Sequence, residues 1–266
     1  MTSRSEGGGK SNDRTRGGLR AVLITAALAV AWEAAFRAGW MNPMIFGSPS
    51  LVAAAAMKDG AAFLQAFQVT SYEMAVAIAI AWIGGIAAGM LAGLARFTSI
   101  LVAPLLSAVI ALPLVVLYPA FVAWLGIGPL SKIAYGAAAG FFPVALSTML
   151  GVRSIDERYL TMARAMGASR WQLVTRVIMR LALPAIVSGL RVGTSIAIIA
   201  VVQSEMLAAT DGIGFWISYH RTLFNVGHVY LGIILVLIVA MVANAVLSVL
   251  ERRSGQWRAG LMAGTP

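Results

Sequence analysis

Long apolar runs alternate with short polar stretches along most of this chain. Six runs have close to the roughly 20 residues that a helix needs to cross about 30 Å of hydrocarbon. The pattern therefore predicts an all-α polytopic membrane protein with six transmembrane helices. The expected spans cover residues 19–38, 70–93, 99–125, 130–150, 184–208 and 229–250.

The composition supports a membrane protein. Hydrophobic residues make up 60% of the 266 residues and charged residues only 11%. A soluble globular domain carries about 25% charged residues, so a soluble core does not explain this chain. The chain has no cysteine, which excludes disulfides, thiol catalysis and cysteine-based metal sites.

The positive charges follow a topology. Fifteen of the 20 Lys and Arg fall at the N-terminus, at Arg96, in the segment 151–183 or at the C-terminus. By the positive-inside rule these parts are cytoplasmic. We expect a multi-pass protein of the plasma (inner) membrane with both termini in the cytoplasm. We expect a disordered cytoplasmic tail over 1–18, a transmembrane domain over 19–252 and a cytoplasmic tail over 253–266. A basic surface for nucleic acid is not indicated, because the charges follow the membrane sides.

The segment Arg153–Pro184 is polar and arginine-rich between two apolar runs. Ser154 with Glu157, and Ser169 with Gln172, have the spacing of capping boxes, which start helices. Gly167 lies between them, where a left-handed residue would end the first helix. The pattern predicts a short helix, a tight turn and a second helix. The first helix would carry one apolar face, made of Ile155, Tyr159, Met162, Ala163 and Met166.

Small residues recur at every fourth position inside three of the expected spans, which lets helices approach closely. Such stripes serve packing or the sliding of helices during a transport cycle. Pro113 and Pro119 should bend or break the third span, because proline removes backbone hydrogen bonds. The stripes are Ala81, Gly85, Gly89 and Gly93, then Gly136 and Gly140, then Gly189 and Gly193.

Few ionisable residues lie within the spans. Glu33 and Arg37 have the spacing of a helical ion pair, and Glu73 and Glu205 fall near the outer ends of their spans. His220 and His228 share one expected outer loop, where we expect them to be solvated. No arrangement resembles a proton relay at mid-membrane, a metal site or a catalytic cluster.

The polar loop resembles the EAA loop of ABC-importer permeases. The resemblance starts from Ala163-x-x-x-Gly167-Ala168-Ser169, with Val177 and Pro184 beyond it. Six other motifs follow the same family in order, over roughly residues 20–257, and are similar to its nitrate/sulfonate/taurine branch. They are Trp32-Glu33, Ser48–Ser50, Ala111–Gly128, Ser188–Gly193, Ser204–Met206 and Gly212–Gly214. The chain departs from the family at Thr161, where a Glu is usual, at Arg180, where a proline is usual, and at Met74, where a basic residue is usual.

The resemblance implies a type I importer fold and a permease subunit without enzymatic activity. Two copies would form the path for a small anion, such as a sulfonate, taurine or nitrate. A cytoplasmic ABC ATPase dimer would bind the ATP, so the permease itself would need no cofactor, and a soluble binding protein outside would deliver the substrate.

The resemblance also implies site residues. The ATPase-docking set is Asp156, Arg158, Tyr159, Met162, Ala163, Arg164, Gly167, Ala168 and Ser169. For Arg158 and Arg164, anionic lipid headgroups are the alternative partners. Candidates for lining the path, or for packing in the core, are Tyr118, Phe141, Ser195, Gln203 and Glu205.

Two rival functions are less well supported. A secondary active transporter usually has repeated halves and ionisable coupling sites at mid-depth, and the sequence shows neither. A membrane-embedded enzyme would need clustered catalytic groups within the bilayer.

Overall fold

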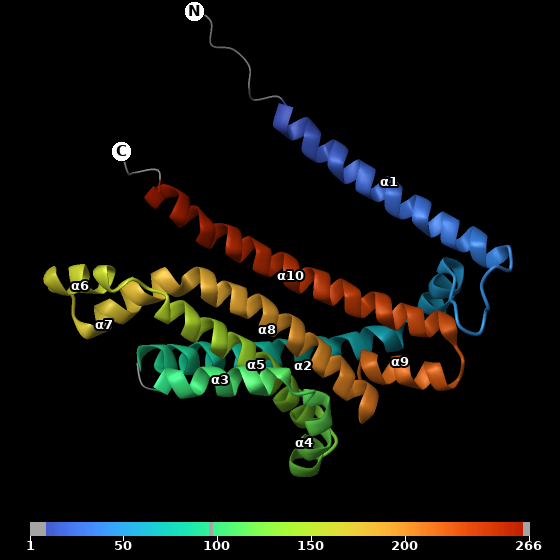
Figure 1. Ribbon diagram of the computed structural model, residues 1–266. Helices are drawn as coiled ribbons and strands as arrows, with labels where there is room; N and C mark the ends of the chain where they lie inside the picture. Colours follow the sequence, from blue (N-terminus) through green and yellow to red (C-terminus); the bar gives the residue numbers. More distant parts are fainter. Residues whose placement is uncertain (1–8, 96–97, 263–266) are drawn as a thin grey trace, which may run out of the picture. The chain divides into compact units, whose positions relative to one another are not determined.

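The computed structural model describes the backbone of residues 9–95 and 98–262, and side chains over 23–95 and 101–248. The described backbone contains helices and no strand. The elements in Figure 1 are α1 (Gly9–Arg37), α2 (Pro49–Leu94), α3 (Thr98–Ala111), η1 (Leu114–Leu117), α4 (Tyr118–Leu125), α5 (Pro129–Arg153), α6 (Glu157–Ala165), α7 (Arg170–Gln172), η2 (Leu173–Ile178), α8 (Met179–Leu207), α9 (Ile213–Thr222) and α10 (Val226–Met262).

Four helical stretches are long and apolar enough to cross a membrane, by length and hydropathy, within the described residues. They are Pro49–Leu94, Pro129–Arg153, Arg170–Leu207 and Val226–Ser248, and a bent pair, Leu101–Ala111 with Leu114–Leu125, would make a fifth. The side chains of α1 are described only from residue 23 on, so the first expected span, 19–38, lies partly outside the described residues and stays a prediction. Helix α1 begins at Gly9, inside the stretch expected to be a disordered tail, and residues 1–8 lie outside the described residues.

The expected third span is not one straight helix. Its two halves meet at an angle of 85°, and Pro113 lies at the break. Pro119 lies in the first turn of α4, where backbone N–H groups have no acceptor within the helix, so a proline costs no hydrogen bond there. Figure 1 shows α4 turned away from α3.

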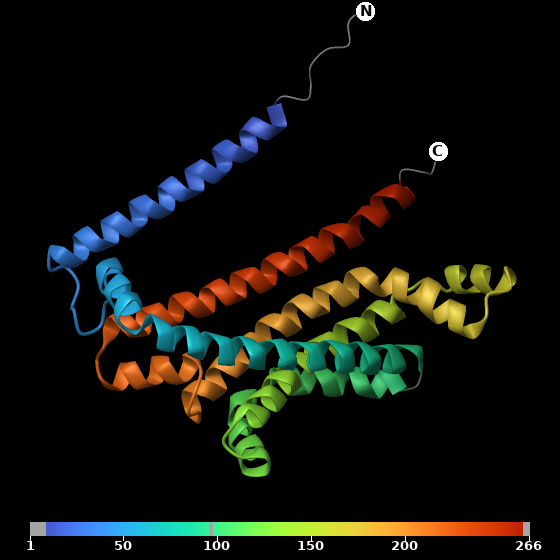
Figure 2. The same ribbon diagram turned by 180° about the vertical axis from the view of Figure 1, so that it is seen from behind.

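The chain divides into two compact units, residues 61–218 with 232–266, and residues 1–60 with 219–231. In the larger unit α5 and α8 pack along one another, as Figures 1 and 2 both show. The glycine stripes make this packing close. Between α5 and α8, an added Cβ would lie 2.6 Å from Val201 at Gly136 and 2.6 Å from Ser147 at Gly189. Between α2 and α5, an added Cβ at Gly85 would lie 2.7 Å from Val144. The small residues are therefore buried packing positions.

The second helix of the polar segment does not stop before the fifth span. Residues 170–207 are continuously helical, with a π-helical stretch at Leu173–Ile178, and Pro184 lies inside α8. The predicted boundary of the fifth span at residue 184 therefore lies within one continuous helix. The leading turn belongs to the same rigid helix that crosses the bundle.

In the smaller unit the expected Glu33–Arg37 pair forms, with Arg37 Nε 2.7 Å from Glu33 Oε1. Glu33 also accepts hydrogen bonds from the backbone N–H and the hydroxyl of Ser50, at 3.1 and 2.9 Å. The carboxylate thus binds the first turn of α2, where a negative charge is favoured. This contact joins the Trp32-Glu33 and Ser48–Ser50 motifs.

The two histidines are not solvated, contrary to the sequence-based expectation. His220 is buried, its ring stacks on His228 with centroids 4.2 Å apart, and His228 Nε2 lies 2.8 Å from Asp59 Oδ2. Burial lowers the pKa of His220, and the adjacent His228 lowers it further. Asp59 is also the position where α2 departs from helical geometry.

Candidate functional site

The short helix α6 begins differently from the prediction. Its N-cap is Asp156, whose Oδ1 accepts the Arg158 N–H at 2.9 Å, while the hydroxyl of Ser154 donates to the Gly151 carbonyl. The expected capping box of Ser154 with Glu157 is therefore wrong. Aspartate performs the same function, since its carboxylate also complements the positive end of the helix.

The turn after α6 is as predicted. Gly167 has a φ of +81°, and the Ala168 N–H donates to the Ala163 carbonyl at 3.0 Å, which is the closing bond of a Schellman motif. Ser169 and Gln172 then form a complete capping box, with bonds of 3.2 and 2.9 Å. Both ends of the turn are thus closed by hydrogen bonds, which makes the α6–α7 pair a stiff unit.

Helix α6 has two apolar faces rather than the single face that was predicted. Ile155, Leu160 and Ala163 pack against the core cluster that contains Val152, Leu173 and Ile178. The other face is exposed, at 55% for Tyr159, 62% for Met162 and 82% for Met166, and Trp171 of α7 is 76% exposed. The inner face anchors the helix, and the outer face exposes large apolar side chains that the described part of the chain does not cover.

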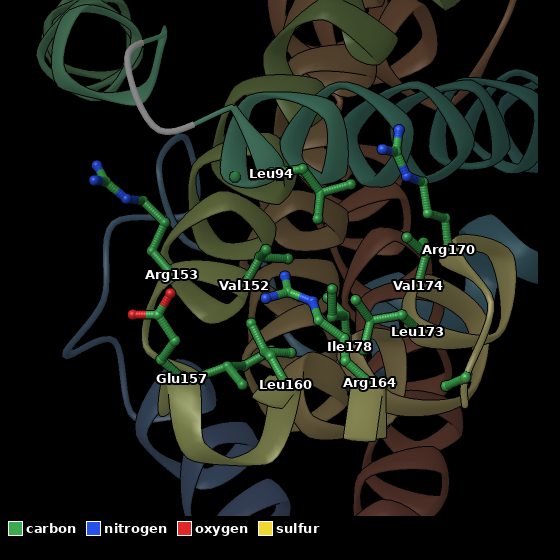
Figure 3. Close-up of a pocket in the computed structure, with 13 residues that line it drawn as sticks. Leu94, Val152, Arg153, Glu157, Leu160, Arg164, Arg170, Leu173, Val174 and Ile178 are labelled. Carbon is green, nitrogen blue, oxygen red and sulfur yellow. The ribbon is translucent and has the colours of Figure 1, made fainter. Parts of the chain in front are cut away.

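A cavity of 1020 Å³ lies under α6, between it and the ends of α2, α5 and η2. Figure 3 shows apolar side chains gathered in its middle, including Leu94, Val152 and Leu173, with Arg153 and Arg170 at its edges. Arg164 also lines it. Arg158 instead lies outside the cavity and approaches Asp156 at 3.8 Å. The surroundings of α6 are therefore basic as well as apolar.

A second polar cluster lies at the far end of the same helices, and the sequence analysis did not predict it. We call it the distal cluster: Thr70 and Glu73 of α2, Lys132 of α5, Glu205 of α8 and the backbone of Asp211–Gly214. Lys132 Nζ lies 2.6 Å from Glu73 Oε1, and both side chains are buried. Lys132 also approaches the Asp211 carbonyl at 3.5 Å.

Glu205 is the centre of this cluster. Its Oε1 accepts a hydrogen bond from the Thr70 hydroxyl and its Oε2 accepts one from the Gly214 N–H, both at 2.7 Å. The Thr70 oxygen in turn accepts the Ile213 N–H at 2.8 Å. The sequence placed Glu73 and Glu205 near the outer ends of their spans. Lys132 was a further signal, since a lysine three residues into an apolar helix needs a buried partner or an exit to water.

The expected path residues separate into two groups. Glu205 and Tyr118 are buried in packing contacts, with the Tyr118 hydroxyl donating to the Ala208 carbonyl, and Phe141 contacts the neighbouring Phe142 ring. Ser195 and Gln203 lie on the side of α8 that faces away from the core, although the Ser195 hydroxyl donates to Arg191 of its own helix. A role in lining the path stays a prediction for all five residues.

Comparison with known proteins decides the family. Residues 83–256 match the model of the binding-protein-dependent transport system inner membrane component. The chain belongs to this family. It is a multi-pass inner-membrane permease of an ABC importer and not an enzyme.

Two curated relatives and one solved structure place the chain further. It is 26% identical to the putative aliphatic sulfonates transport permease SsuC of Bacillus subtilis, over 94% of this chain and 91% of the relative. It is 34% identical to the taurine transport permease TauC of Escherichia coli, over 65% of this chain and 63% of the relative. A chain of the inward-facing MetNI methionine ABC transporter has the same fold, with a TM-score of 0.61 at 17% identity over 73% of this chain and 96% of that one. The expected type I importer fold is therefore confirmed.

Proposed function

We propose that two copies of this permease form the path for a small organic or inorganic anion of the sulfonate, taurine or nitrate kind. Helix α6 of each copy docks on a cytoplasmic ATPase, and ATP-driven closure of the ATPase pair tips the spans between inward-open and outward-open states. An extracytoplasmic binding protein delivers the anion at the opposite end. Both termini then lie in the cytoplasm, in agreement with the positive-inside rule.

The observation that carries this proposal is the outward apolar face of α6. Three large side chains, Tyr159, Met162 and Met166, project from a helix whose ends are fixed by Asp156 and Gly167. Exposed apolar clusters on short rigid helices are typical of protein docking surfaces. Lipid is a poor occupant, because the neighbouring exposed residues include Asp156, Glu157 and Arg158.

The continuity of the helix after α6 explains how a movement of the docked α6 would be transmitted to the spans. The α6–α7 turn leads into a helix that runs unbroken from Arg170 to Leu207. A push on α6 is therefore transferred to α8 through Gly167 and the core contacts of Leu160 and Ala163. A stiff helix transmits such a displacement along its whole length.

Polar side chains on the outward side of α8 support the proposed path. Ser188, Val192, Ile199 and Gln203 are exposed and Ser195 is half-buried, at helical spacing on the most extensively packed pair of helices. A stripe that met only lipid would be apolar throughout, so its polar members favour a partly hydrated neighbour, such as the second copy and the path between them.

The docking is tested by photo-cross-linking in the reconstituted complex. The natural chain has no cysteine, so Met162→Cys places one label on α6, and Trp124→Cys on the exposed side of α4 is the matched control. We expect a cross-link from position 162 to the ATPase subunit and none from position 124. A cross-link to lipid alone from position 162 contradicts the proposal.

The transport function is tested in proteoliposomes. ATP hydrolysis should rise when the binding protein carries its ligand, with taurine, alkanesulfonates and nitrate tried in turn. Uptake driven by an ion gradient in the absence of ATP would contradict the proposal and favour a secondary transporter.

A further inference from the structure

The distal cluster lies outside the ATPase-docking surface of α6 and outside the outward stripe of α8. It lies at the end of the bundle opposite to α6. The C-terminal ends of α2 and α5 are near α6, and Glu73 and Lys132 each lie about 30 Å of helix before those ends. Its four side chains, Thr70, Glu73, Lys132 and Glu205, are all at most 2% exposed. Charged groups are rarely buried in a membrane protein without a function.

The hydrogen bonds of Thr70 have one possible direction. The Ile213 N–H donates to the Thr70 hydroxyl oxygen, so the single hydroxyl hydrogen is left to donate to Glu205. Glu205 must therefore accept at Oε1, and it also accepts at Oε2 from the Gly214 N–H. Both oxygens of the carboxylate are used, one toward α2 and one toward the start of α9.

The loop backbone fits around this carboxylate. Gly212 has a φ of +108°, and a Cβ there would collide with the Glu205 carboxylate. A Cβ at Gly214 would lie 2.5 Å from the Val202 carbonyl oxygen and 2.6 Å from Glu205 Cβ. The glycines of the Gly212–Gly214 motif thus serve the close approach of Glu205.

Lys132 connects a third helix, α5, to the distal cluster. Glu73 and Glu205 are electrostatic neighbours, and Lys132 of α5 is the ammonium group beside both. Lys132 also reaches the loop carbonyl of Asp211. Separation of the loop would deprive the buried Glu205 carboxylate of the Gly214 N–H and the buried Lys132 ammonium of the Asp211 carbonyl, which is unfavourable.

We propose that Glu205 is a positioning residue that clamps the Asp211–Gly214 loop and the start of α9 to α2 and α8. The loop and the distal ends of α2, α5 and α8 then move as one rigid body when the transporter changes state. The inference rests on the proposed function in one respect: this loop lies on the side where the binding protein docks, so the clamp passes the force of docking into the spans.

The clamp predicts a specific defect for Glu205→Gln. The amide has one acceptor oxygen and one donor nitrogen where the carboxylate has two acceptor oxygens. It can accept from either the Thr70 hydroxyl or the Gly214 N–H, so one of these two donors loses its acceptor. Thr70→Val removes the bridging hydroxyl and should have the same effect. Thr70→Ser keeps the hydroxyl and is the matched control.

The test measures the distance between loop and helix in the permease–ATPase complex in lipid nanodiscs. Spin labels are placed at Thr210→Cys in the loop and at Ile83→Cys on α2, both exposed in the natural chain. We expect the width of the distance distribution to at least double in Glu205→Gln and Thr70→Val, and to stay unchanged in Thr70→Ser. Equal widths in all four proteins would overturn the clamp.

A second readout separates the clamp from a purely structural role and from the proposed function. With Glu205→Gln, the binding-protein concentration that gives half-maximal ATPase stimulation should rise by about tenfold. A purely structural defect would lower the melting temperature and leave this concentration within twofold of the original, which overturns the inference. If the original complex shows no stimulation at all, the proposed function fails, and the spin-label widths still decide whether the clamp exists.

Discussion

Gly140 of α5 and Gly193 of α8 face one another so closely that each excludes a side chain on the other. A Cβ on Gly140 would lie 2.8 Å from the Gly193 carbonyl oxygen, and a Cβ on Gly193 would lie 2.7 Å from that of Gly140. Since both obstacles are backbone atoms, no rotamer change relieves the contact. The two helices would have to separate.

We therefore expect Gly193→Ala to destabilise the permease by about 1–3 kcal/mol, as overpacking does in other cores. The measurement is thermal unfolding in detergent. Gly60→Ala is the control, because it is also helical and no atom lies within 4 Å of its added Cβ. A melting temperature for Gly193→Ala equal to that of the control would show that α5 and α8 separate at no cost.

The turn at Gly167 is the next target, because its φ of +81° strains any residue with a side chain. Nothing lies within 4 Å of its added Cβ, so the effect of Gly167→Ala is conformational and should be about 1 kcal/mol. We expect weaker association with the ATPase, measured as the fraction co-purified.

Two further variants grade this effect. Gly167→Asn should be milder, since Asn tolerates the left-handed region, and Gly167→Pro should abolish stimulated ATP hydrolysis. If Gly167→Ala weakens association with the ATPase no more than Gly167→Asn does, a conformational role for Gly167 is contradicted.

Charge at Gln203 tests the path. Gln203→Glu places a negative charge on the exposed side of α8 and should slow uptake of an anion, whereas Gln203→Lys should spare or increase it. The measurement is uptake of labelled substrate by proteoliposomes at two salt concentrations. If both variants reduce uptake equally, Gln203 lies on a packing or lipid-facing surface.

The pH dependence of stability tests the histidine pair. The pKa of His220 is lowered from 6.5 by burial and by His228, with Lys58 acting in the same direction and Asp59 in the opposite one. Below pH 6.5 the unfolded chain therefore binds a proton that folded His220 does not, so stability falls as pH decreases toward the lowered pKa, and levels off below it. We expect the melting temperature to fall between pH 7.5 and 5.5, and to fall less in His220→Gln. An unchanged slope in the variant would exclude His220 as the cause.

Local features of this chain could be read from neighbouring residues. The turn at Gly167, the capping box of Ser169 with Gln172 and the break at Pro113 each depend on a few consecutive residues, and all three are present. The close packing of the glycine stripes followed from their spacing, because in lipid small residues are what allows helices to approach. The Glu33–Arg37 pair followed for the same local reason.

Partnerships across the fold could not be read in this way. Thr70 and Glu205 are separated by 135 positions, and nothing in the pattern around either residue names the other. The histidines were expected in water because both fall in a connecting segment, but the folded segment stacks their rings and buries His220. The inner and outer apolar faces of α6 were merged into one, because periodicity counts apolar positions without showing what covers them.

The apolar runs, the charge asymmetry and the glycine-centred turn are thus determined by the sequence itself, since they depend on local backbone preference and on transfer into lipid. The tertiary structure alone decides that Glu73 meets Lys132, that Glu205 holds the Gly212–Gly214 loop, and that Tyr159, Met162 and Met166 remain uncovered. Each of these depends on which helices come together, and long-range packing has no periodic signature in the chain.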